Sequence, residues 1–189
     1  MRIIGGEFKG RGLFAPAGLE TRPTADKVKE ALFNIVRDRI PGAVVLDLFS
    51  GSGALGLEAL SRGAARAILV DSHPQALAAM TRNAAPLALG ERLVIIKADL
   101  TRPVKSLAGT KADLVFLDPP YGLELAEKAL KIALRHDWIT SGGLAVIEHS
   151  RKENPRPQGL VLTGERRYGR TSLSFFELEP DQNEAASPD

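Results

Sequence analysis

The sequence contains no cysteine, only three histidines and few aromatic residues, which make up 5% of the chain. Without cysteine the chain forms no disulfide, no zinc–thiolate site and no thiol nucleophile. His73, His136 and His149 have no metal-ligand spacing such as HExxH, so we expect no metal site. No apolar run is long enough to span a bilayer, so we expect a cytoplasmic protein without a membrane partner.

Positive charge is missing from one segment, the C-terminal tail. From Glu177 to Asp189 the sequence has five acidic residues and no Lys or Arg. Removing those five acids raises the net charge from +2 to +7. A basic body of this kind suits a nucleic-acid partner. Residues 180–189 are polar and poor in apolar side chains, so we expect them to form a disordered acidic tail.

Short apolar runs alternate with amphipathic stretches along most of the chain. Such strand–helix repeats predict one α/β domain with a doubly wound, mostly parallel sheet of Rossmann-like type. The turn Tyr168-Gly169-Arg170 predicts a closing antiparallel hairpin, an arrangement typical of class I methyltransferases. The expected strands are 44–49, 67–71, 93–98, 112–117, 143–148, 160–167 and 171–178, and the expected helices are 54–62, 74–87 and 123–135.

Residues 1–40 have a different pattern, and we expect them to form an extension docked on a core of residues 41–179. Two glycine-rich stretches, 2–6 and 9–14, predict a short β-hairpin. A helix is expected to follow at residues 25–39. The residues predicted to define this helix are the N-cap Thr24 and the apolar stripe Val28, Leu32, Ile35 and Val36.

The tetrapeptide Asp118-Pro119-Pro120-Tyr121 directly follows one of the expected strands. This pattern is typical of methyltransferases that modify exocyclic or amide nitrogens with S-adenosylmethionine. Such a nitrogen is a poor nucleophile because its lone pair is delocalised. The Asp118 carboxylate and the Pro119 carbonyl can accept hydrogen bonds from the amino group and orient it. Tyr121 offers a flat face on which a base can stack, and we expect all four residues to be catalytic.

A glycine-rich loop closes the first expected strand, and Gly51 and Gly53 within it let the backbone approach a ligand closely. Ligands of open α/β sheets bind at the carboxyl ends of the strands. Asp71 ends the second strand, where a carboxylate can accept both ribose hydroxyls, and Asp99 ends the third, where it can accept from the adenine amino group. Asp47 either orders the loop or meets the cofactor's ammonium through water. The residues expected to bind S-adenosylmethionine are Asp47, Phe49, Ser50, Gly51, Gly53, Asp71, Ser72, Asp99, Leu100 and Asp118.

The same loop also fits the dinucleotide-binding pattern GxGxxG, at residues 51–56. An acid two residues before Phe49 is, however, the methyltransferase form of the loop, and the tetrapeptide at residues 118–121 has no role in hydride transfer. Each acid also has a simpler interpretation as a cap or turn residue.

On these motifs the sequence resembles the RsmD family, bacterial methyltransferases that modify guanine N2 in small-subunit ribosomal RNA. The resemblance implies a class I fold, S-adenosylmethionine as cofactor, and ribosomal RNA or a small-subunit assembly particle as partner. In the family the target is guanine 966 of 16S RNA. We expect a monomer. Lys27, Lys29 and Asp71 stand where the family often has Arg, Arg and Glu. The segments that carry the resemblance are residues 2–6, 9–11, 22–24, 31–34, 47–64 and 118–121.

The basic residues of the N-terminal extension are the expected RNA contacts, namely Arg2, Lys9, Arg11 and Arg22. A guanine that is paired or stacked must be splayed out to reach Tyr121, and backbone contacts must offset the cost. We therefore expect these residues near the mouth of the active site. The simpler alternative is that the hairpin only covers an edge of the fold.

Three other functions stay open. An adenine-N6 methyltransferase would use the same tetrapeptide but usually carries a target-recognition insertion, which this sequence lacks. A protein glutamine methyltransferase typically has Asn in place of Asp118. A non-catalytic ribosome assembly factor on the same fold would be expected to have lost the glycine loop or the tetrapeptide, and both are present.

Overall fold

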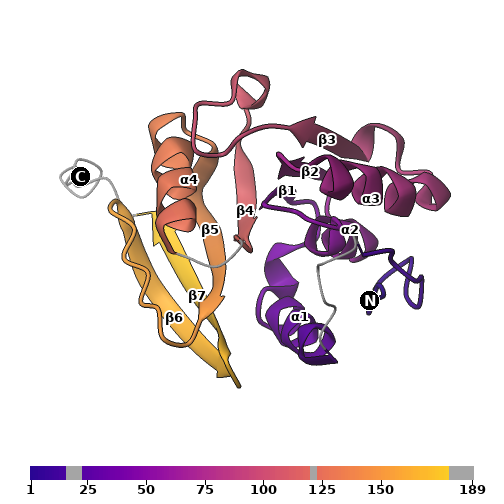
Figure 1. Cartoon of the computed structure of the whole chain (residues 1–189), viewed down its shortest axis with the longest axis horizontal. Helices are drawn as coiled ribbons and strands as arrows, with labels where there is room; N and C mark the ends of the chain where they lie inside the picture. Colours follow the sequence, from indigo (N-terminus) through magenta and orange to yellow (C-terminus); the bar gives the residue numbers. More distant parts are fainter. Residues whose placement is uncertain (16–22, 120–122, 179–189) are drawn as a thin grey trace, which may run out of the picture.

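The computed structural model describes residues 1–15, 23–119 and 123–178. Seven strands form one sheet in the order β3-β2-β1-β4-β5-β7-β6 (Figure 1). The first five strands are parallel to their neighbours, whereas β7 is antiparallel to both β5 and β6. The predicted α/β fold with a closing hairpin is confirmed. The strands are β1 (Val44–Leu48), β2 (Arg66–Asp71), β3 (Leu93–Lys97), β4 (Ala112–Leu117), β5 (Ile139–Ser150), β6 (Leu160–Tyr168) and β7 (Thr171–Leu178).

Helices cover both faces of the sheet and bury two separate apolar clusters. One cluster joins α1 (Pro23–Ile35), α2 (Ala54–Ser61) and α3 (Pro74–Ala84) to one face of the sheet, through residues such as Leu57. The other joins α4 (Leu123–Arg135) to the opposite face, through residues such as Leu130. Strand residues alternate between the two clusters, as in β4, where Phe116 belongs to the first and Leu117 to the second. Buried on both faces, the parallel strands read as continuous apolar runs.

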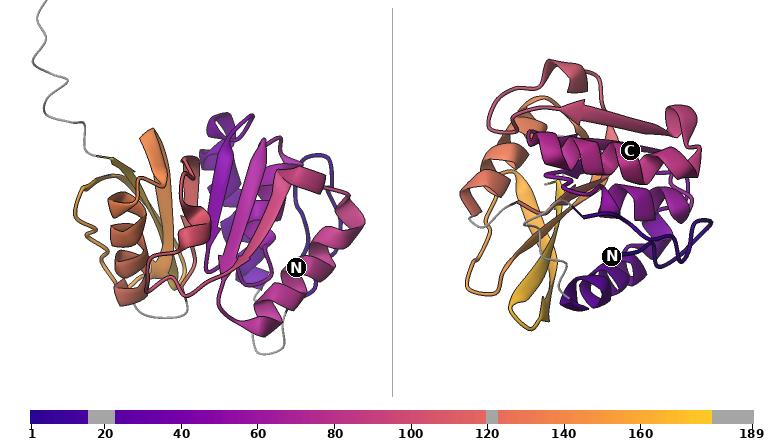
Figure 2. Two further views of the ribbon diagram at one scale, coloured as in Figure 1. Left: turned by 90° about the horizontal axis from the view of Figure 1, so that it is seen from above. Right: turned by 45° about the vertical axis from the view of Figure 1, so that its right-hand side comes forward.

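The N-terminal segment, residues 1–15, is not the predicted hairpin. Its only β pairing among the described residues is a single bridge between Arg2 and Gly12. The segment instead lies between α1 and α2 (Figure 2, right), and its apolar side chains Ile3 and Leu13 belong to the same cluster as α1–α3. Its glycines serve close packing on α2, because a Cβ on Gly6 would stand 1.8 Å from the carbonyl oxygen of Ser61. The sheet edges are β3 and β6, and side chains of α1, α2 and α3, such as Lys29, Glu58 and Asn83, bond the backbone of the segment.

Helix α1 also differs from its prediction. It begins at Pro23, so Thr24 stands inside the first turn and is not the N-cap. A proline at the first position of a helix costs no hydrogen bond, so the helix can start at Pro23, two residues before the predicted Ala25. Ile35 of the predicted apolar stripe is 44% exposed, whereas Phe33, outside that stripe, is fully buried. The helix ends at Ile35, and a short 3-10 helix follows at Arg37–Arg39.

Strand β5 is much longer than the predicted 143–148. It includes the expected turn Ser141-Gly142-Gly143 as an irregularity in its pairing with β4. Residues 120–122 and 180–189 lie outside the described residues, so the proposed tail and the second half of the tetrapeptide are not placed. No helix of the described residues could cross a membrane, and no group of three metal-ligating side chains occurs among them.

Candidate active site

The glycine loop leaves β1 through a left-handed residue, Phe49, whose φ is 59°. A non-glycine residue in this region is uncommon and is held only by surrounding contacts. Here Ser50 supplies them: its Oγ accepts from the N–H of Val70 at 2.9 Å and donates to the carbonyl oxygen of Asp47 at 2.5 Å. Its N–H also donates to the Val70 carbonyl at 3.1 Å. The loop is thereby fixed at the carboxyl ends of β1 and β2.

Asp71, at the end of β2, supports the same loop from the other side. Its carboxylate accepts from the N–H of Gly51 at 3.0 Å and from the N–H of His73 at 2.9 Å. A carboxylate has about four acceptor positions, so two remain for a ligand. Asp71 is half-buried, and Ser72 beside it is exposed. This position fits the predicted contact with two ribose hydroxyls, and loop support is a second role that the sequence did not indicate.

Asp47 is buried beneath the first turn of α2. Its Oδ2 accepts from the N–H of Gly56 at 2.9 Å, and only 1% of the residue is exposed. Burial raises the pKa of Asp47 to about 7, against the Gly56 hydrogen bond that lowers it, and the charges of Asp118 and Asp71 raise it further. Of the two roles expected for Asp47, ordering of the loop is the one for which the structure shows a contact.

Asp99 follows β3 and is engaged by its own turn. Its Oδ1 accepts from the Thr101 N–H at 2.9 Å and from the Thr101 hydroxyl at 2.6 Å, and its Oδ2 lies 3.5 Å from Arg102 Nε. The Thr101 hydrogen bonds lower the pKa of Asp99. The neighbouring Leu100 is buried. Asp99 therefore acts as a turn residue in this structure, and its contact with adenine stays a prediction.

Asp118 and Pro119 follow β4, whereas Pro120 and Tyr121 lie outside the described residues. The Asp118 side chain is open to solvent on one side. Burial by the protein around the rest of it raises its pKa to about 6. Because β4 pairs with β1, Asp118 comes one position after the register pair Leu48 and Leu117 and lies beside the start of the glycine loop.

Glu148 is a fifth acid at the carboxyl ends of the strands, and sequence reasoning missed it. It is half-buried on β5, the strand next to β4. Burial, followed by the charge of Asp118, raises its pKa to about 8. The signal was present, because Glu148 ends the strand predicted at 143–148 just as Asp71 ends the second predicted strand.

Four of these acids share one face as well as one edge of the sheet. Alternation along each strand places Asp47, Asp71, Asp118 and Glu148 on the side of α1–α3, since the residues two positions earlier, Val45, Leu69, Phe116 and Val146, belong to that cluster. A ligand with a positive charge and several hydrogen-bond donors suits such an edge.

Comparison with known proteins also indicates a methyltransferase. The family described as Conserved hypothetical protein 95 matches residues 1–177. The protein named Ribosomal RNA small subunit methyltransferase D from Escherichia coli is 38% identical over 157 residues, covering 83% of this chain and 78% of that protein. YlbH of Bacillus subtilis is also 38% identical, over 94% of this chain and 98% of its own length. The chain belongs to the RsmD family of methyltransferases.

Solved structures agree with membership of the RsmD family. The yhhF protein of Escherichia coli superposes with a TM-score of 0.83 at 35% identity and covers 95% of this chain and 98% of its own. Protein TTHA0928 of Thermus thermophilus gives a TM-score of 0.78 at 32% identity, over 94% and 99% of the two chains. The predicted class I methyltransferase fold is therefore shown, and the family implies an enzyme that uses S-adenosylmethionine.

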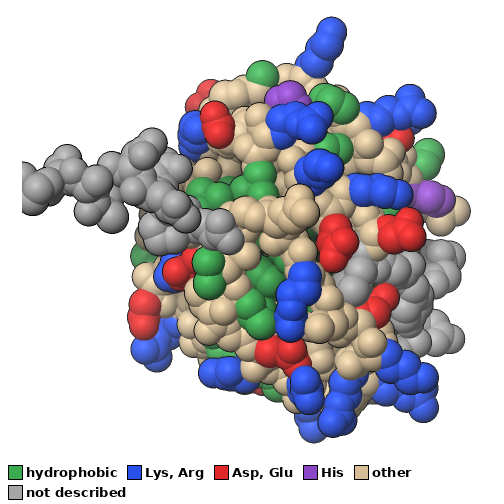
Figure 3. All heavy atoms as spheres, turned by 90° about the vertical axis from the view of Figure 1, so that its left-hand side faces the viewer, with side chains coloured by type: hydrophobic (Ala, Val, Ile, Leu, Met, Phe, Trp, Pro, Cys, Tyr) green, Lys and Arg blue, Asp and Glu red, His purple; other side chains and the backbone are tan. Residues whose placement is uncertain are grey.

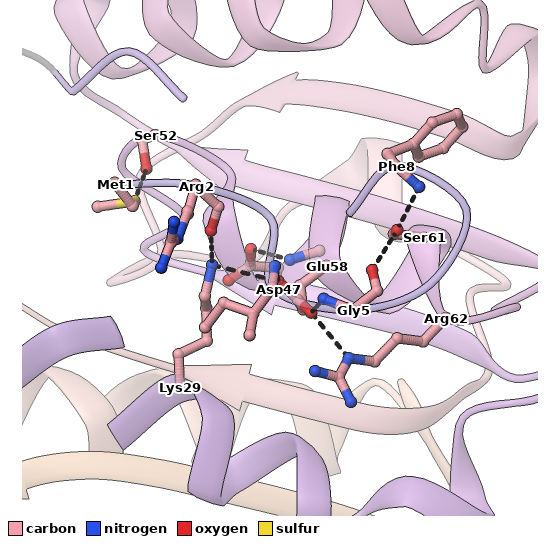
Figure 4. Close-up of polar contacts among 12 residues, drawn as sticks. Met1, Arg2, Gly5, Phe8, Lys29, Asp47, Ser52, Glu58, Ser61 and Arg62 are labelled. Carbon is pink, nitrogen blue, oxygen red and sulfur yellow. Dashed lines mark hydrogen bonds and ion pairs between the residues drawn. The ribbon is translucent and has the colours of Figure 1, made fainter. Parts of the chain in front are cut away.

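Not all basic residues of the N-terminal segment lie together in this RsmD-family structure. Arg2 and Arg11 are close in the backbone, since Arg2 forms a bridge with Gly12 and the N–H of Ile3 donates to the carbonyl of Arg11 at 2.9 Å, whereas Lys9 stands apart. The Oγ of Ser52 in the glycine loop lies 3.4 Å from Met1 Sδ, so Arg2 stands near the loop (Figure 4). The N–H of Phe8, next to Lys9, donates to Ser61 Oγ at the other end of α2. An eight-residue helix is about 12 Å long, so Lys9 at the tip of the segment is separated from Arg2. Arg22 lies outside the described residues.

Two recesses lined by described residues lie away from Asp47, Asp71, Asp118 and Glu148. One is bounded by Gly42, Asp113 and Thr140, at the amino ends of β1 and β4. The other lies between Val36 and Phe175, beside α1 and β7. Neither includes a predicted site residue of this RsmD-family chain, and the carboxyl edge remains the candidate active site because the motifs and the acids converge there.

Proposed function

We propose that this protein transfers a methyl group from S-adenosylmethionine to the exocyclic N2 of a guanine in small-subunit ribosomal RNA. One observation carries the proposal: Asp118, the acceptor expected for the target amine, directly follows β4, the strand that pairs with β1, and so lies beside the glycine loop that is expected to hold the cofactor. Relatives named for small-subunit ribosomal RNA methylation support the choice of RNA. Position 966 of 16S RNA is the family's target and our expectation for this chain.

The residues present fit the cofactor. Free acceptor positions on Asp71 suit ribose hydroxyls, and the loop at Gly51 and Gly53 is held open toward the same edge by Ser50. S-adenosylmethionine supplies an electrophilic methyl group on a positively charged sulfur. The carboxyl groups of Asp71 and Asp118 can give this edge the negative charge that such a ligand requires.

The chain's own contribution is to orient the target nitrogen. Asp118 accepts a hydrogen bond from the amino group and turns its lone pair toward the methyl carbon, and it can take up the proton that the nitrogen loses. The Pro119 carbonyl offers a second acceptor, and Tyr121 a surface for stacking. Proximity and alignment then supply most of the rate enhancement.

RNA contact requires cations near this edge, and the chain offers two groups. Arg2, Lys9 and Arg11 belong to the N-terminal segment, and all three are exposed. The second group lies at the β6–β7 turn, where the N–H of Arg151, just past β5, donates to the carbonyl of Arg170 at 2.8 Å. The β6–β7 turn lies at the lower end of the molecule in Figure 1. Figure 3, which shows the left-hand side of that view, has several Lys and Arg side chains at the same lower end.

Mass spectrometry of ribosomal RNA nucleosides tests the proposal. RNA from a strain lacking this gene should lose one N2-methylguanosine, and the purified protein with labelled S-adenosylmethionine should restore it. Loss of N6-methyladenosine instead would establish the adenine alternative. An unchanged nucleoside profile together with no transfer in vitro would leave only the assembly-factor function.

A further inference from the structure

We propose that Glu148 is a second substrate-contacting carboxylate, which together with Asp118 binds the donor edge of guanine and excludes adenine. This inference rests on the proposed function and names the specificity determinant of that site. It adds a residue that neither the glycine loop nor the tetrapeptide contains.

The sheet places the two side chains next to each other. Strands β4 and β5 are parallel, and their last register pair is Leu117 with Ile147. Asp118 and Glu148 are the next position on each strand, and adjacent strands lie about 4.8 Å apart. Both side chains point to the same face, since Phe116 and Val146, two residues earlier, share one cluster.

The two carboxyl groups have no cation to neutralise them among the described residues. Every ion pair there involves other acids. On the same face, Glu148 has the apolar Leu173 of β7 as its register partner. Repulsion between two adjacent carboxyl groups is unfavourable unless donors approach them. Burial raises the pKa of both Asp118 and Glu148, and the charge of Asp118 raises the pKa of Glu148 further. A ligand that supplies N–H donors would relieve the repulsion between the two groups.

Guanine supplies two adjacent donors that match two adjacent carboxyl groups. Its N1–H and its N2 amino group stand side by side on one edge of the base, so two acceptors in a row bind them together. Adenine has an amino group beside N1, but its N1 is an acceptor. With Asp118 on the amino group, the ionised carboxylate of Glu148 would receive a donor from guanine and face a lone pair in adenine. Sites built to bond a donor reject ligands that lack it strongly.

The test uses 2-aminopurine, which keeps the N2 amino group of guanine but has an acceptor at N1. Small ribosomal subunits are reconstituted with RNA carrying guanine or 2-aminopurine at the target, and kcat/KM is measured with labelled S-adenosylmethionine. For the wild-type protein, the guanine subunits should be preferred by at least about a hundredfold. Glu148→Gln should reduce that preference at least about tenfold, because its amide N–H can donate to N1.

Glu91→Gln, at an exposed surface position, is the matched control and should keep the wild-type preference. Glu148→Asp keeps the acceptor and should also keep the preference while losing rate, and it replaces Glu148→Gln if that variant fails to fold. Equal preferences in wild type and Glu148→Gln, or loss of preference in Glu148→Asp, would overturn the inference. No turnover by the wild-type protein on guanine subunits would instead refute the proposed function.

Discussion

The ammonium of Lys29 lies 3.2 Å from Glu58 Oε2 in the protein interior, and the two side chains are only 6% and 0% exposed. Burial lowers the pKa of Lys29, and the charge of Glu58 opposes this shift. Glu58 also accepts from the N–H groups of Ile4 and Gly5, both at 2.8 Å, and from Arg62 Nε. One carboxylate of α2 therefore joins α1 and the N-terminal segment (Figure 4).

Replacing Glu58 by Gln should destabilise the protein strongly. The substitution leaves Lys29 charged, buried and without its partner, which costs about 3–5 kcal/mol in comparable cases. Denaturant unfolding measures the change. Glu124→Gln, which removes an exposed pair with Lys128, is the control and should shift stability by no more than about 1 kcal/mol. Equal effects of the two substitutions would mean that the buried pair is not what holds these elements together.

Asp71→Ala should weaken binding of S-adenosylmethionine by about 1.5–3 kcal/mol, the value of hydrogen bonds to a charged acceptor. The variant loses both the acceptor for the ligand and the support of Gly51. Calorimetry on the free protein measures the affinity. Asp113→Ala, at the amino end of β4 and far from the carboxyl ends of the strands, is a control that should leave the affinity unchanged. An Asp71→Ala protein with wild-type affinity would refute the assignment of this carboxylate.

Asp118→Ala should reduce methyl transfer about 10²–10⁴-fold, the usual range for a positioned acid–base group. Its cofactor affinity should stay near that of wild type, because the carboxylate acts on the target amine. Tyr121→Ala should lose less, since stacking orients the base without the polar contact. Transfer assays and calorimetry on the same preparations separate the two effects. Near wild-type turnover by Asp118→Ala would make Asp118 a structural residue.

The buried acids predict that stability falls as pH rises. Asp47 binds its proton more tightly in the folded state, with a pKa of about 7 against 3.8 in the unfolded chain. The folded state therefore holds more protons between about pH 4 and 7, and its stability decreases through that range. The shift corresponds to a decrease on the order of 4 kcal/mol.

Asp47→Asn should flatten this decrease while keeping an acceptor for Gly56. Urea unfolding of both proteins at pH 4 and at pH 8 gives the comparison, and Asp137→Asn at an exposed turn serves as the control. If Asp47→Asn shows the same loss of stability between these two pH values as wild type, Asp47 is not the group responsible.

The RNA surface can be located by charge reversal. Lys9→Glu combined with Arg11→Glu should weaken RNA binding and flatten its salt dependence, by a slope of roughly 0.9 for each phosphate that the protein no longer neutralises. Cofactor affinity should not change. Lys128→Glu with Lys131→Glu on α4, across the sheet from the N-terminal segment, makes the same charge change as a control. If both pairs leave RNA affinity unaltered, Arg166, Arg167 and Arg170 of the β6–β7 turn become the group to reverse.

The parallel core and the acids at its edge were predictable, because a strand buried on both faces is a plain apolar run and a polar residue marks its end. Asp71, Asp99 and Asp118 were found in this way. Glu148 was overlooked only because no motif surrounds it. The N-terminal segment could not be predicted, since its backbone is bonded to Glu58 and Ser61, more than 50 residues away in sequence. Within α1 the sequence likewise misplaced the N-cap at Thr24 and the buried face at Ile35.

The way in which the N-terminal segment is attached has a consequence for the substitutions it tolerates. Four side chains of the core hold the segment through backbone atoms alone: Lys29 bonds the carbonyl of Arg2, Glu58 the N–H groups of Ile4 and Gly5, Ser61 the N–H of Phe8, and Asn83 the N–H and carbonyl of Phe14. None of these bonds depends on which side chain the segment carries. Its exposed side chains can therefore be replaced without loss of these bonds, so that the charge of this surface can change while the backbone of the segment stays anchored.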